Sequence, residues 1–184
     1  LGKEDKLLNI GCGNGLMEIL LGHWVKSITS VDFSKGMVKR AKENNKEYKN
    51  VMFYRANILN LSFLKRRFNF NKVLCNSVIQ YLNNIDEIKK ALIEIKNVTE
   101  KNAVILISAN PDKRKFNDFI SGYDRLSLKK EEIEKKKEAT RISLWTDPWD
   151  LKKIAEDLGY KVDVQKMHPG VWQSWFMYDL LLRR

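Results

Sequence analysis

The sequence predicts an α/β fold in three layers: a doubly wound, mostly parallel, seven-stranded sheet with a C-terminal antiparallel hairpin. Two observations lead to this prediction. Apolar runs typical of buried strands alternate with helical patterns from the start of the chain, and parallel strands joined by helices require right-handed crossovers. Near the C-terminus, a turn sequence separates two further strand patterns, which is typical of a hairpin.

Five strands and their connecting helices are expected in the first 110 residues. The strand patterns cover 6–10, 27–31, 51–54, 72–75 and 103–108. One helical pattern covers 16–24 and another covers 85–98. Between them, Ser34 can cap a helix that carries Met37, Val38 and Ala41 on one face. This alternation indicates a parallel sheet, whose ligands bind at the carboxyl ends of the strands.

The pattern changes after Pro111. Residues 112–146 are charged and interrupted by Gly122, with a helical pattern over 129–139. We expect a lid or insertion here, beyond the end of the fifth strand, within a single domain that spans 1–184.

The last forty residues predict a helix and the closing hairpin. Asp147-Pro148 is a helix start, with an N-cap acid before a proline at the first helical position, and Gly159 ends the helix. Strands are expected over 160–166 and 171–182, joined by a turn at 168–170. We expect this turn at the end of the sheet opposite the exit of the fifth strand.

Composition narrows the class of protein. The net charge of +11 allows a nucleic-acid partner, but 25 lysines accompany only nine arginines and are spread along solvated helix faces. Arginine binds phosphate through two parallel hydrogen bonds, and it is the scarcer of the two residues here, so nucleic acid is a disfavoured partner.

Cysteine usage and hydropathy give further expectations. Cys12 and Cys75 cannot form a disulfide framework, and no group of His, Cys, Asp and Glu has metal-site spacing, so no metal is expected. No apolar run approaches the roughly 20 residues of a membrane span. A cytoplasmic location is expected, and a trimmed N-terminus before Leu1 stays open.

A glycine loop follows the first strand pattern, in the run Leu8-Asn9-Ile10-Gly11-Cys12-Gly13-Asn14-Gly15. Asp32 ends the next strand pattern, where a carboxylate can accept hydrogen bonds from ribose hydroxyls. The spacing is G-x-G-x-G, which differs from the G-x-G-x-x-G of dinucleotide folds and from the phosphate-binding P-loop.

From Lys6 to about Ser108, this pattern resembles the class I S-adenosylmethionine-dependent methyltransferases. The resemblance implies that the glycines cradle the methionine part of S-adenosylmethionine, that Asp32 binds its ribose and that Phe33 lies against its adenine. It places Asn57 at the adenine amino group and Asn76 at the cofactor amine and methyl. The cofactor-binding residues so assigned are Gly11, Gly13, Gly15, Asp32, Phe33, Asn57, Ile58 and Asn76.

Two positions depart from the family pattern. The family commonly carries an acid where this chain has Asn9, and usually an aspartate where it has Asn57. An amide oxygen still accepts a hydrogen bond at each place, with less charge attraction. A cofactor-binding module with decayed catalysis is therefore one alternative function.

The acceptor side offers weaker candidates. Tyr81 and His168 are the candidate catalytic residues, although core packing is the more favoured interpretation of Tyr81. Gln80 cannot act as a base but can orient an acceptor. The aromatic side chains Tyr123, Trp145, Trp149, Trp172 and Trp175 gather in the insertion and the last hairpin. They form either a second small core or a stacking wall for a sugar or flat acceptor.

The candidate substrate-binding residues are thus Gln80, Tyr123, Trp145 and Trp172. The run 173–180 also resembles the ends of bacterial methyltransferases that act on sugars in surface-polysaccharide synthesis. The predicted function is methyl transfer from S-adenosylmethionine to a small molecule or a sugar or glycan precursor. The alternative within enzymes is a transfer- or ribosomal-RNA methyltransferase, and the sequence leaves the acceptor atom and the oligomeric state open.

Overall fold

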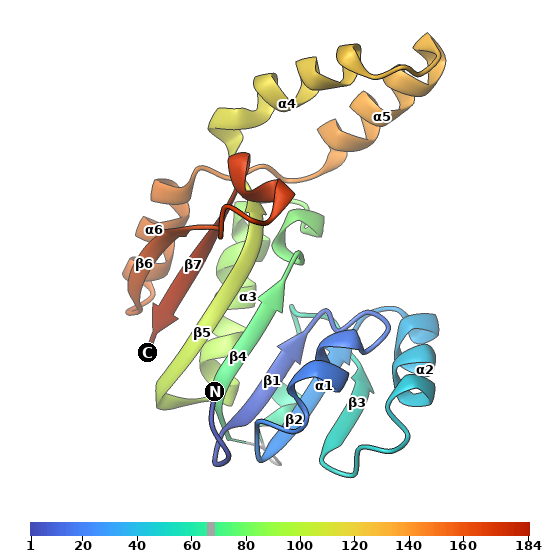
Figure 1. Cartoon of the computed structure of the whole chain (residues 1–184). Helices are drawn as coiled ribbons and strands as arrows, with labels where there is room; N and C mark the ends of the chain where they lie inside the picture. Colours follow the sequence, from blue (N-terminus) through green and yellow to red (C-terminus); the bar gives the residue numbers. More distant parts are fainter. Residues whose placement is uncertain (66–68) are drawn as a thin grey trace.

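The computed structural model describes residues 1–65 and 69–184 and contains one seven-stranded sheet of order β3-β2-β1-β4-β5-β7-β6 (Figure 1). The strands are β1 Lys6–Ile10, β2 Ser27–Asp32, β3 Val51–Arg55, β4 Phe70–Asn76, β5 Thr99–Pro111, β6 Lys161–Lys166 and β7 Met177–Arg183. The first five pair in parallel, while β7 is antiparallel to both β5 and β6. The predicted fold class is confirmed.

Helices cover both faces of the sheet, which gives the three layers (Figure 1). They are α1 Leu16–Leu21, α2 Lys35–Asn44, α3 Ile85–Val98, α4 Phe116–Gly122, α5 Lys130–Ile142 and α6 Pro148–Asp157. Alternation along β1 shows the two faces: Leu8 belongs to the main core beneath α3 and α6, whereas Leu7 packs with Val25 and Ile28 on the α1 side. None of the helices within the described ranges is long and apolar enough to cross a membrane.

Side-chain caps begin the helices where the sequence predicts them. The hydroxyl of Ser34 accepts a hydrogen bond from the backbone N–H of Met37, and the carboxylate of Asp147 accepts one from that of Trp149. Each cap satisfies a backbone donor that the first helical turn leaves unpaired.

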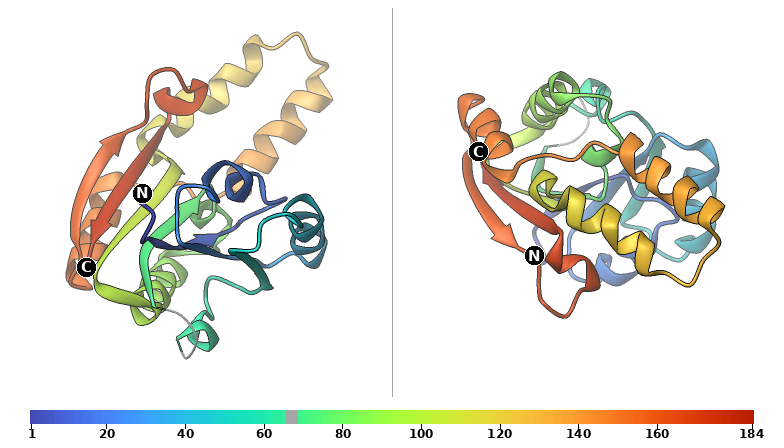
Figure 2. Two further views of the ribbon diagram at one scale, coloured as in Figure 1. Left: turned by 60° about the horizontal axis from the view of Figure 1, so that its bottom comes forward. Right: turned by 90° about the horizontal axis from the view of Figure 1, so that it is seen from above.

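The segment after Pro111 lies beyond the carboxyl end of β5, as expected, and forms a helical hairpin of α4, a short 3-10 turn at Tyr123–Arg125 and α5. Figure 1 shows this hairpin projecting from the sheet, and Figure 2 shows it from above, extending over the carboxyl edge. Helix α4 ends at Gly122, where the sequence analysis placed an interruption, and the 3-10 turn follows directly because φ of −60° and ψ of −29° at this glycine are helical.

Two expectations about the closing hairpin are wrong. Residues Trp172–Trp175 form a 3-10 turn rather than part of the last strand, which begins at Met177. Pro111 at the end of β5 pairs with Met177, and Lys166 at the end of β6 pairs with Tyr178. Because β6 therefore runs in the same direction as β5, the turn that holds His168 lies at the same edge as the exit of β5.

Candidate active site

The glycine loop leaves β1 and enters α1 at the carboxyl edge of the sheet. Gly11, Gly13 and Gly15 have φ values of 75°, 55° and 81°, a region that favours glycine. A Cβ on Gly11 would lie 2.3 Å from a methyl carbon of Val78, and one on Gly15 would lie 2.4 Å from Nδ2 of Asn45. A Cβ on Gly13 would meet nothing within 4 Å. Two glycines therefore pack the loop in place, and the third leaves its backbone open to a ligand.

Asp32 connects the loop to the end of β2. Its side chain is 8% exposed, and its carboxylate accepts hydrogen bonds from the backbone N–H groups of Gly13 and Ser34, both at 2.9 Å. Each carboxylate oxygen has a further lone pair, so the group can accept hydroxyl hydrogens from a ligand while it holds the loop.

A cleft of about 580 Å³, here called the glycine-loop cleft, opens above the loop. Six of the eight sequence-predicted cofactor residues line it: Gly11, Gly13, Asp32, Phe33, Asn57 and Ile58. The ring of Phe33 is 73% exposed, so it presents an apolar wall to the cleft. Asn57 uses Oδ1 to accept a hydrogen bond from the backbone N–H of Leu59, which fixes its own turn.

Gly15 and Asn76 are not among the lining residues. Gly15 faces α2 instead, and Asn76 is exposed at the end of β4. The next residue, Ser77, lines the cleft with a φ of 55°, and its N–H donates to the carbonyl of Ser108 on β5. A left-handed serine is a position that sequence patterns do not reveal, because serine gives no signal for positive φ.

Glu18 on α1 is a second residue that the sequence analysis missed. It is fully buried, and its Oε1 accepts hydrogen bonds from Nδ2 of Asn9 at 2.6 Å and from Oγ of Ser30 at 2.5 Å. Oε2 has no partner among the described residues. The acid that the family pattern places on the first strand is thus replaced by Asn9 and a neighbouring acid from the helix.

The acids Glu18 and Asp32 affect the pKa of the neighbouring Cys12 thiol. Burial, together with the negative charges of Glu18 and Asp32, raises the pKa of the Cys12 thiol to about 12. Cys12 therefore stays a neutral thiol near pH 7 and does not act as a nucleophile.

A second cleft of about 510 Å³, here called the aromatic cleft, adjoins the first and shares Ser77 and Tyr81 with it. All four sequence-predicted substrate residues line it: Gln80, Tyr123, Trp145 and Trp172. The side-chain Oε1 of Gln80 is buried and has no hydrogen-bond partner among the described residues. The helical hairpin and the Trp172–Trp175 turn, both distant from Gln80 in sequence, also contribute to the wall.

The aromatic residues form a small core and a wall at the same time. Phe119 is at the centre, with its ring centroid 5.4 Å from that of Trp145, 5.8 Å from that of Trp175 and 4.4 Å from that of Phe176. Trp149 is 58% exposed and enters none of the ring contacts found in the described ranges. The two interpretations of this cluster are therefore compatible, since rings that pack together also face the cleft.

The two catalytic candidates differ in position. Core packing is the wrong interpretation of Tyr81, because this side chain is 73% exposed where the two clefts meet. His168 is exposed, its Nδ1 accepts a hydrogen bond from the backbone N–H of Gly170, and it lines neither cleft. The described residues contain no group of three His, Cys, Asp or Glu side chains that could hold a metal ion.

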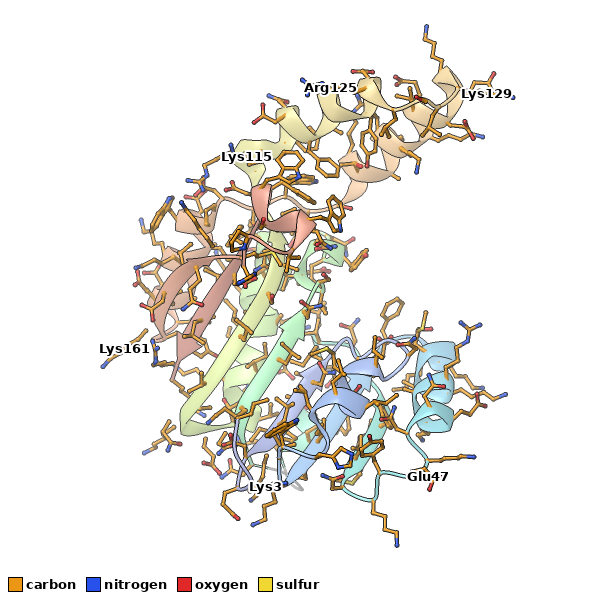
Figure 3. All side chains as sticks on the ribbon, viewed as in Figure 1. Lys3, Glu47, Lys115, Arg125, Lys129 and Lys161 are labelled. Carbon is orange, nitrogen blue, oxygen red and sulfur yellow. The ribbon has the colours of Figure 1, made fainter. Side chains whose placement is uncertain are left out.

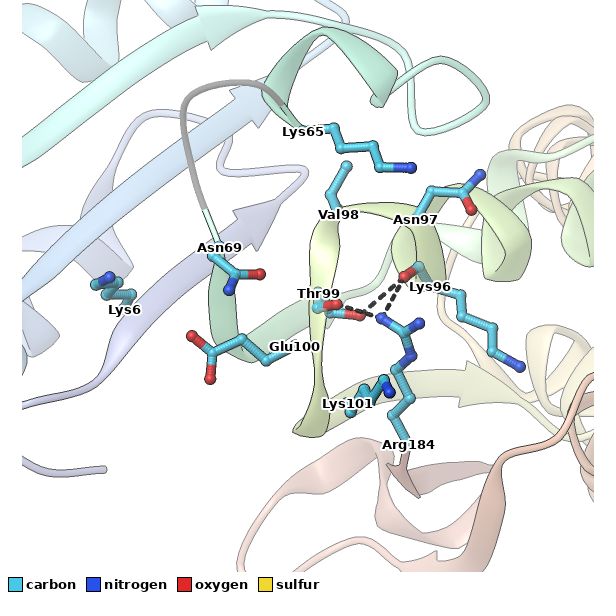
Figure 4. A pocket seen from close by; sticks show the side chains of 10 residues that line it. All are labelled: Lys6, Lys65, Asn69, Lys96, Asn97, Val98, Thr99, Glu100, Lys101 and Arg184. Atoms are coloured by element: carbon cyan, nitrogen blue, oxygen red, sulfur yellow. Dashed lines mark hydrogen bonds between the residues drawn. The ribbon is translucent and has the colours of Figure 1, made fainter.

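A further hollow of about 880 Å³ lies at the opposite edge of the sheet, where Lys6 and Thr99 begin their strands (Figure 4). The guanidinium of Arg184 donates there to the backbone carbonyls of Lys96 and Thr99. Because ligands of doubly wound sheets bind at the carboxyl edge, this hollow is not a candidate active site.

The fold and the glycine-loop cleft define a methyltransferase, and comparison with known proteins supports this class. A family model described as a methyltransferase domain matches residues 1–159. The chain belongs to the class I S-adenosylmethionine-dependent methyltransferases.

Individual relatives are distant. Ubiquinone biosynthesis O-methyltransferase of Pelagibacter ubique (strain HTCC1062) is 29% identical over 106 residues, which cover 58% of this chain and 42% of that protein. The match thus spans less than half the length of that relative.

Two solved structures show the same fold. N-methyltransferase NodS from Bradyrhizobium japonicum WM9, in complex with S-adenosyl-L-homocysteine, has a TM-score of 0.72 at 13% identity and covers 100% of this chain and 79% of its own. Magnesium protoporphyrin IX methyltransferase (ChlM) from Synechocystis PCC 6803, also with that ligand bound, has a TM-score of 0.73 at 16% identity, covering 99% and 75%.

Proposed function

We propose that the protein transfers a methyl group from S-adenosylmethionine to a small molecule built on a ring, such as a sugar or glycan precursor. The observation that carries this proposal is the junction of the two clefts at Ser77 and Tyr81. Methyl transfer requires donor and acceptor to be held in line in a site that excludes water. Two adjoining clefts, one above a glycine loop and one lined by aromatic rings, supply such an arrangement.

The residues of the glycine-loop cleft fit the cofactor. The open backbone at Gly13 allows a ligand to approach closely, the carboxylate of Asp32 retains lone pairs for hydroxyl groups, and Phe33 offers a flat apolar surface. When bound, S-adenosylmethionine supplies an electrophilic methyl group on a sulfonium.

The aromatic cleft would orient the acceptor rather than deprotonate it. No His, Asp or Glu is found among the described residues that line this cleft. Oε1 of Gln80 is buried and has no partner among the described residues, and a rotation of this side chain toward the cleft would let it accept a hydrogen bond from a hydroxyl or amine of the acceptor. Trp145 and Trp172 would stack on the ring and exclude water.

The names of the relatives support a small-molecule acceptor, since they refer to ubiquinone biosynthesis and to magnesium protoporphyrin IX. The charge distribution gives less support to RNA. Lys3, Lys115, Lys129 and Lys161 lie on separate parts of the molecule (Figure 3), and none of them lines either cleft.

Calorimetry and a transfer assay test the proposal together. We expect S-adenosylhomocysteine to bind, and the label of S-adenosyl-[methyl-³H]methionine to appear in members of a panel of nucleotide sugars and hydroxylated aromatic acids. Absence of S-adenosylhomocysteine binding at millimolar concentration would contradict the proposal, whereas binding without label in any acceptor would favour the cofactor-binding module with decayed catalysis. Label in transfer or ribosomal RNA, with tight and salt-sensitive binding, would favour the RNA alternative.

A further inference from the structure

Three consecutive lysines on α5 have different surroundings. Nζ of Lys137 lies 2.6 Å from a carboxylate oxygen of Asp124 and 3.6 Å from one of Glu134. Lys136 lines the aromatic cleft, and its ammonium has no ion-pair partner in the described ranges of the chain. Lys135 and Lys136 are both exposed, but Lys135 does not line this cleft. The acids of the hairpin thus neutralise the charge of Lys137, whereas no acid in the described part of the chain pairs with Lys136 at the cleft.

Helical geometry keeps Lys136 on the cleft side of α5. Ala139 and Thr140, three and four residues further on, line the same cleft, as residues on one helix face do. The hydroxyl of Thr140 donates to the backbone carbonyl of Lys136, and the hydroxyls of Thr140 and Tyr123 lie 2.9 Å apart. These contacts connect the face that carries Lys136 to the neighbouring arm of the hairpin.

Lys136 is also the one lysine or arginine among the described lining residues, which include no acid. Lys136 is itself exposed, and the aromatic rings of the cleft screen its charge less than water does on that side. Gln80 lines the same cleft, and its Oε1, which has no partner among the described residues, is an acceptor of hydrogen bonds. The described lining of the cleft therefore combines one cationic side chain, one hydrogen-bond acceptor and several aromatic rings.

We propose that the methyl acceptor is an anionic ring compound, whose carboxylate, phosphate or sulfonate pairs with Lys136 while its reacting hydroxyl or amine donates to Gln80. This inference rests on the proposed function and specifies its substrate class. It makes Lys136 a specificity-determining residue, because a neutral analogue of the acceptor would lack the ion pair.

Two fluorescent probes test the anion preference without knowledge of the natural substrate. 8-Anilinonaphthalene-1-sulfonate and N-phenyl-1-naphthylamine share one ring system, and only the first carries a sulfonate. We expect saturable binding of both probes, with Lys136→Met weakening the anionic probe about fivefold, as for an ion pair worth about 1 kcal/mol. The same variant leaves the neutral probe unchanged, and Lys135→Met, the matched control, leaves both unchanged.

Three outcomes would overturn the inference. Lys136→Met and Lys135→Met could weaken the anionic probe equally, Lys136→Met could weaken both probes equally, or neither probe could bind the unmodified protein. Calorimetry with S-adenosylhomocysteine on the same preparations separates the two proposals. Normal binding of that ligand with no probe discrimination removes only the anionic-acceptor inference. Loss of that ligand in the unmodified protein removes the proposed function itself.

Discussion

The glycine-loop cleft and the aromatic cleft adjoin at the carboxyl edge of one sheet, yet they are built in different ways. The first is held by left-handed glycines and by buried polar groups, of which Asp32 is 8% exposed and Glu18 fully buried. The second is formed by a projecting hairpin and by side chains such as Trp172, which is 67% exposed. The difference indicates that the cofactor side tolerates little change, while the acceptor side can vary without loss of the fold.

The largest expected effect is that of Gly11→Ala. The new Cβ would meet Val78 at 2.3 Å in a backbone with φ 75°, so both strain and overpacking oppose it. We expect a loss of about 2–5 kcal/mol in the free energy of unfolding, measured by urea denaturation. Adding Val78→Ala should restore part of this loss, and Gly36→Ala, where the Cβ has space, should cost nothing. A tolerated Gly11→Ala would contradict the tight loop.

The next largest expected effect is a difference in amide hydrogen exchange between the sheet and the helical hairpin. Its helices α4 and α5 bury no fully enclosed side chain among the described residues, whereas β1 and β5 lie in the core. We expect amides of 116–142 to exchange about a hundredfold faster than those of β1, because local opening there exposes little apolar surface. If the hairpin is a lid, 8-anilinonaphthalene-1-sulfonate should slow this exchange. Equal rates with and without the probe would indicate a fixed insertion.

Asp32→Ala tests the ribose position. The carboxylate would no longer accept hydrogen bonds from the ligand, so we expect S-adenosylhomocysteine binding to weaken by about 1–3 kcal/mol in calorimetry. Part of the loss could come from the loop, since Gly13 N–H also loses its acceptor. Asp32→Asn, which retains one oxygen, should keep more of the affinity than alanine, and equal affinities would argue against direct contact.

Glu18→Gln tests whether the buried carboxylate of Glu18 attracts the positive sulfonium of S-adenosylmethionine electrostatically. S-adenosylmethionine carries this charge and S-adenosylhomocysteine does not, so removal of a nearby negative charge should weaken the first ligand about threefold relative to the second. Glu43→Gln, a change at an exposed position on α2, serves as the control. A uniform loss of both ligands would show that Glu18 only supports the loop.

The smallest effect on stability is expected for Trp172→Ala. Because its side chain is exposed, the free energy of unfolding should change by no more than about 0.5 kcal/mol, and S-adenosylhomocysteine should bind normally. Binding of N-phenyl-1-naphthylamine should fall about threefold as a stacking surface is lost. Weaker cofactor binding in this variant would show that the two clefts are coupled.

The sequence by itself determined the sheet, the glycine loop and the position of Asp32. These features depend on local rules: apolar runs bounded by glycine predict buried strands, and glycine at fixed spacing predicts a backbone that only glycine adopts easily. For the same reason, the helix starts at Ser34 and Asp147 could be predicted from the capping residues alone.

The tertiary structure alone decided how the acceptor side is assembled. The pairing of Pro111 with Met177 brings the Trp172–Trp175 turn to the carboxyl edge, which reverses the expected position of the His168 turn. The burial of Glu18 and the exposure of Tyr81 likewise depend on neighbours distant in the chain. Strand direction and burial arise from long-range pairing, and a local pattern of residue types does not encode which distant segments will meet.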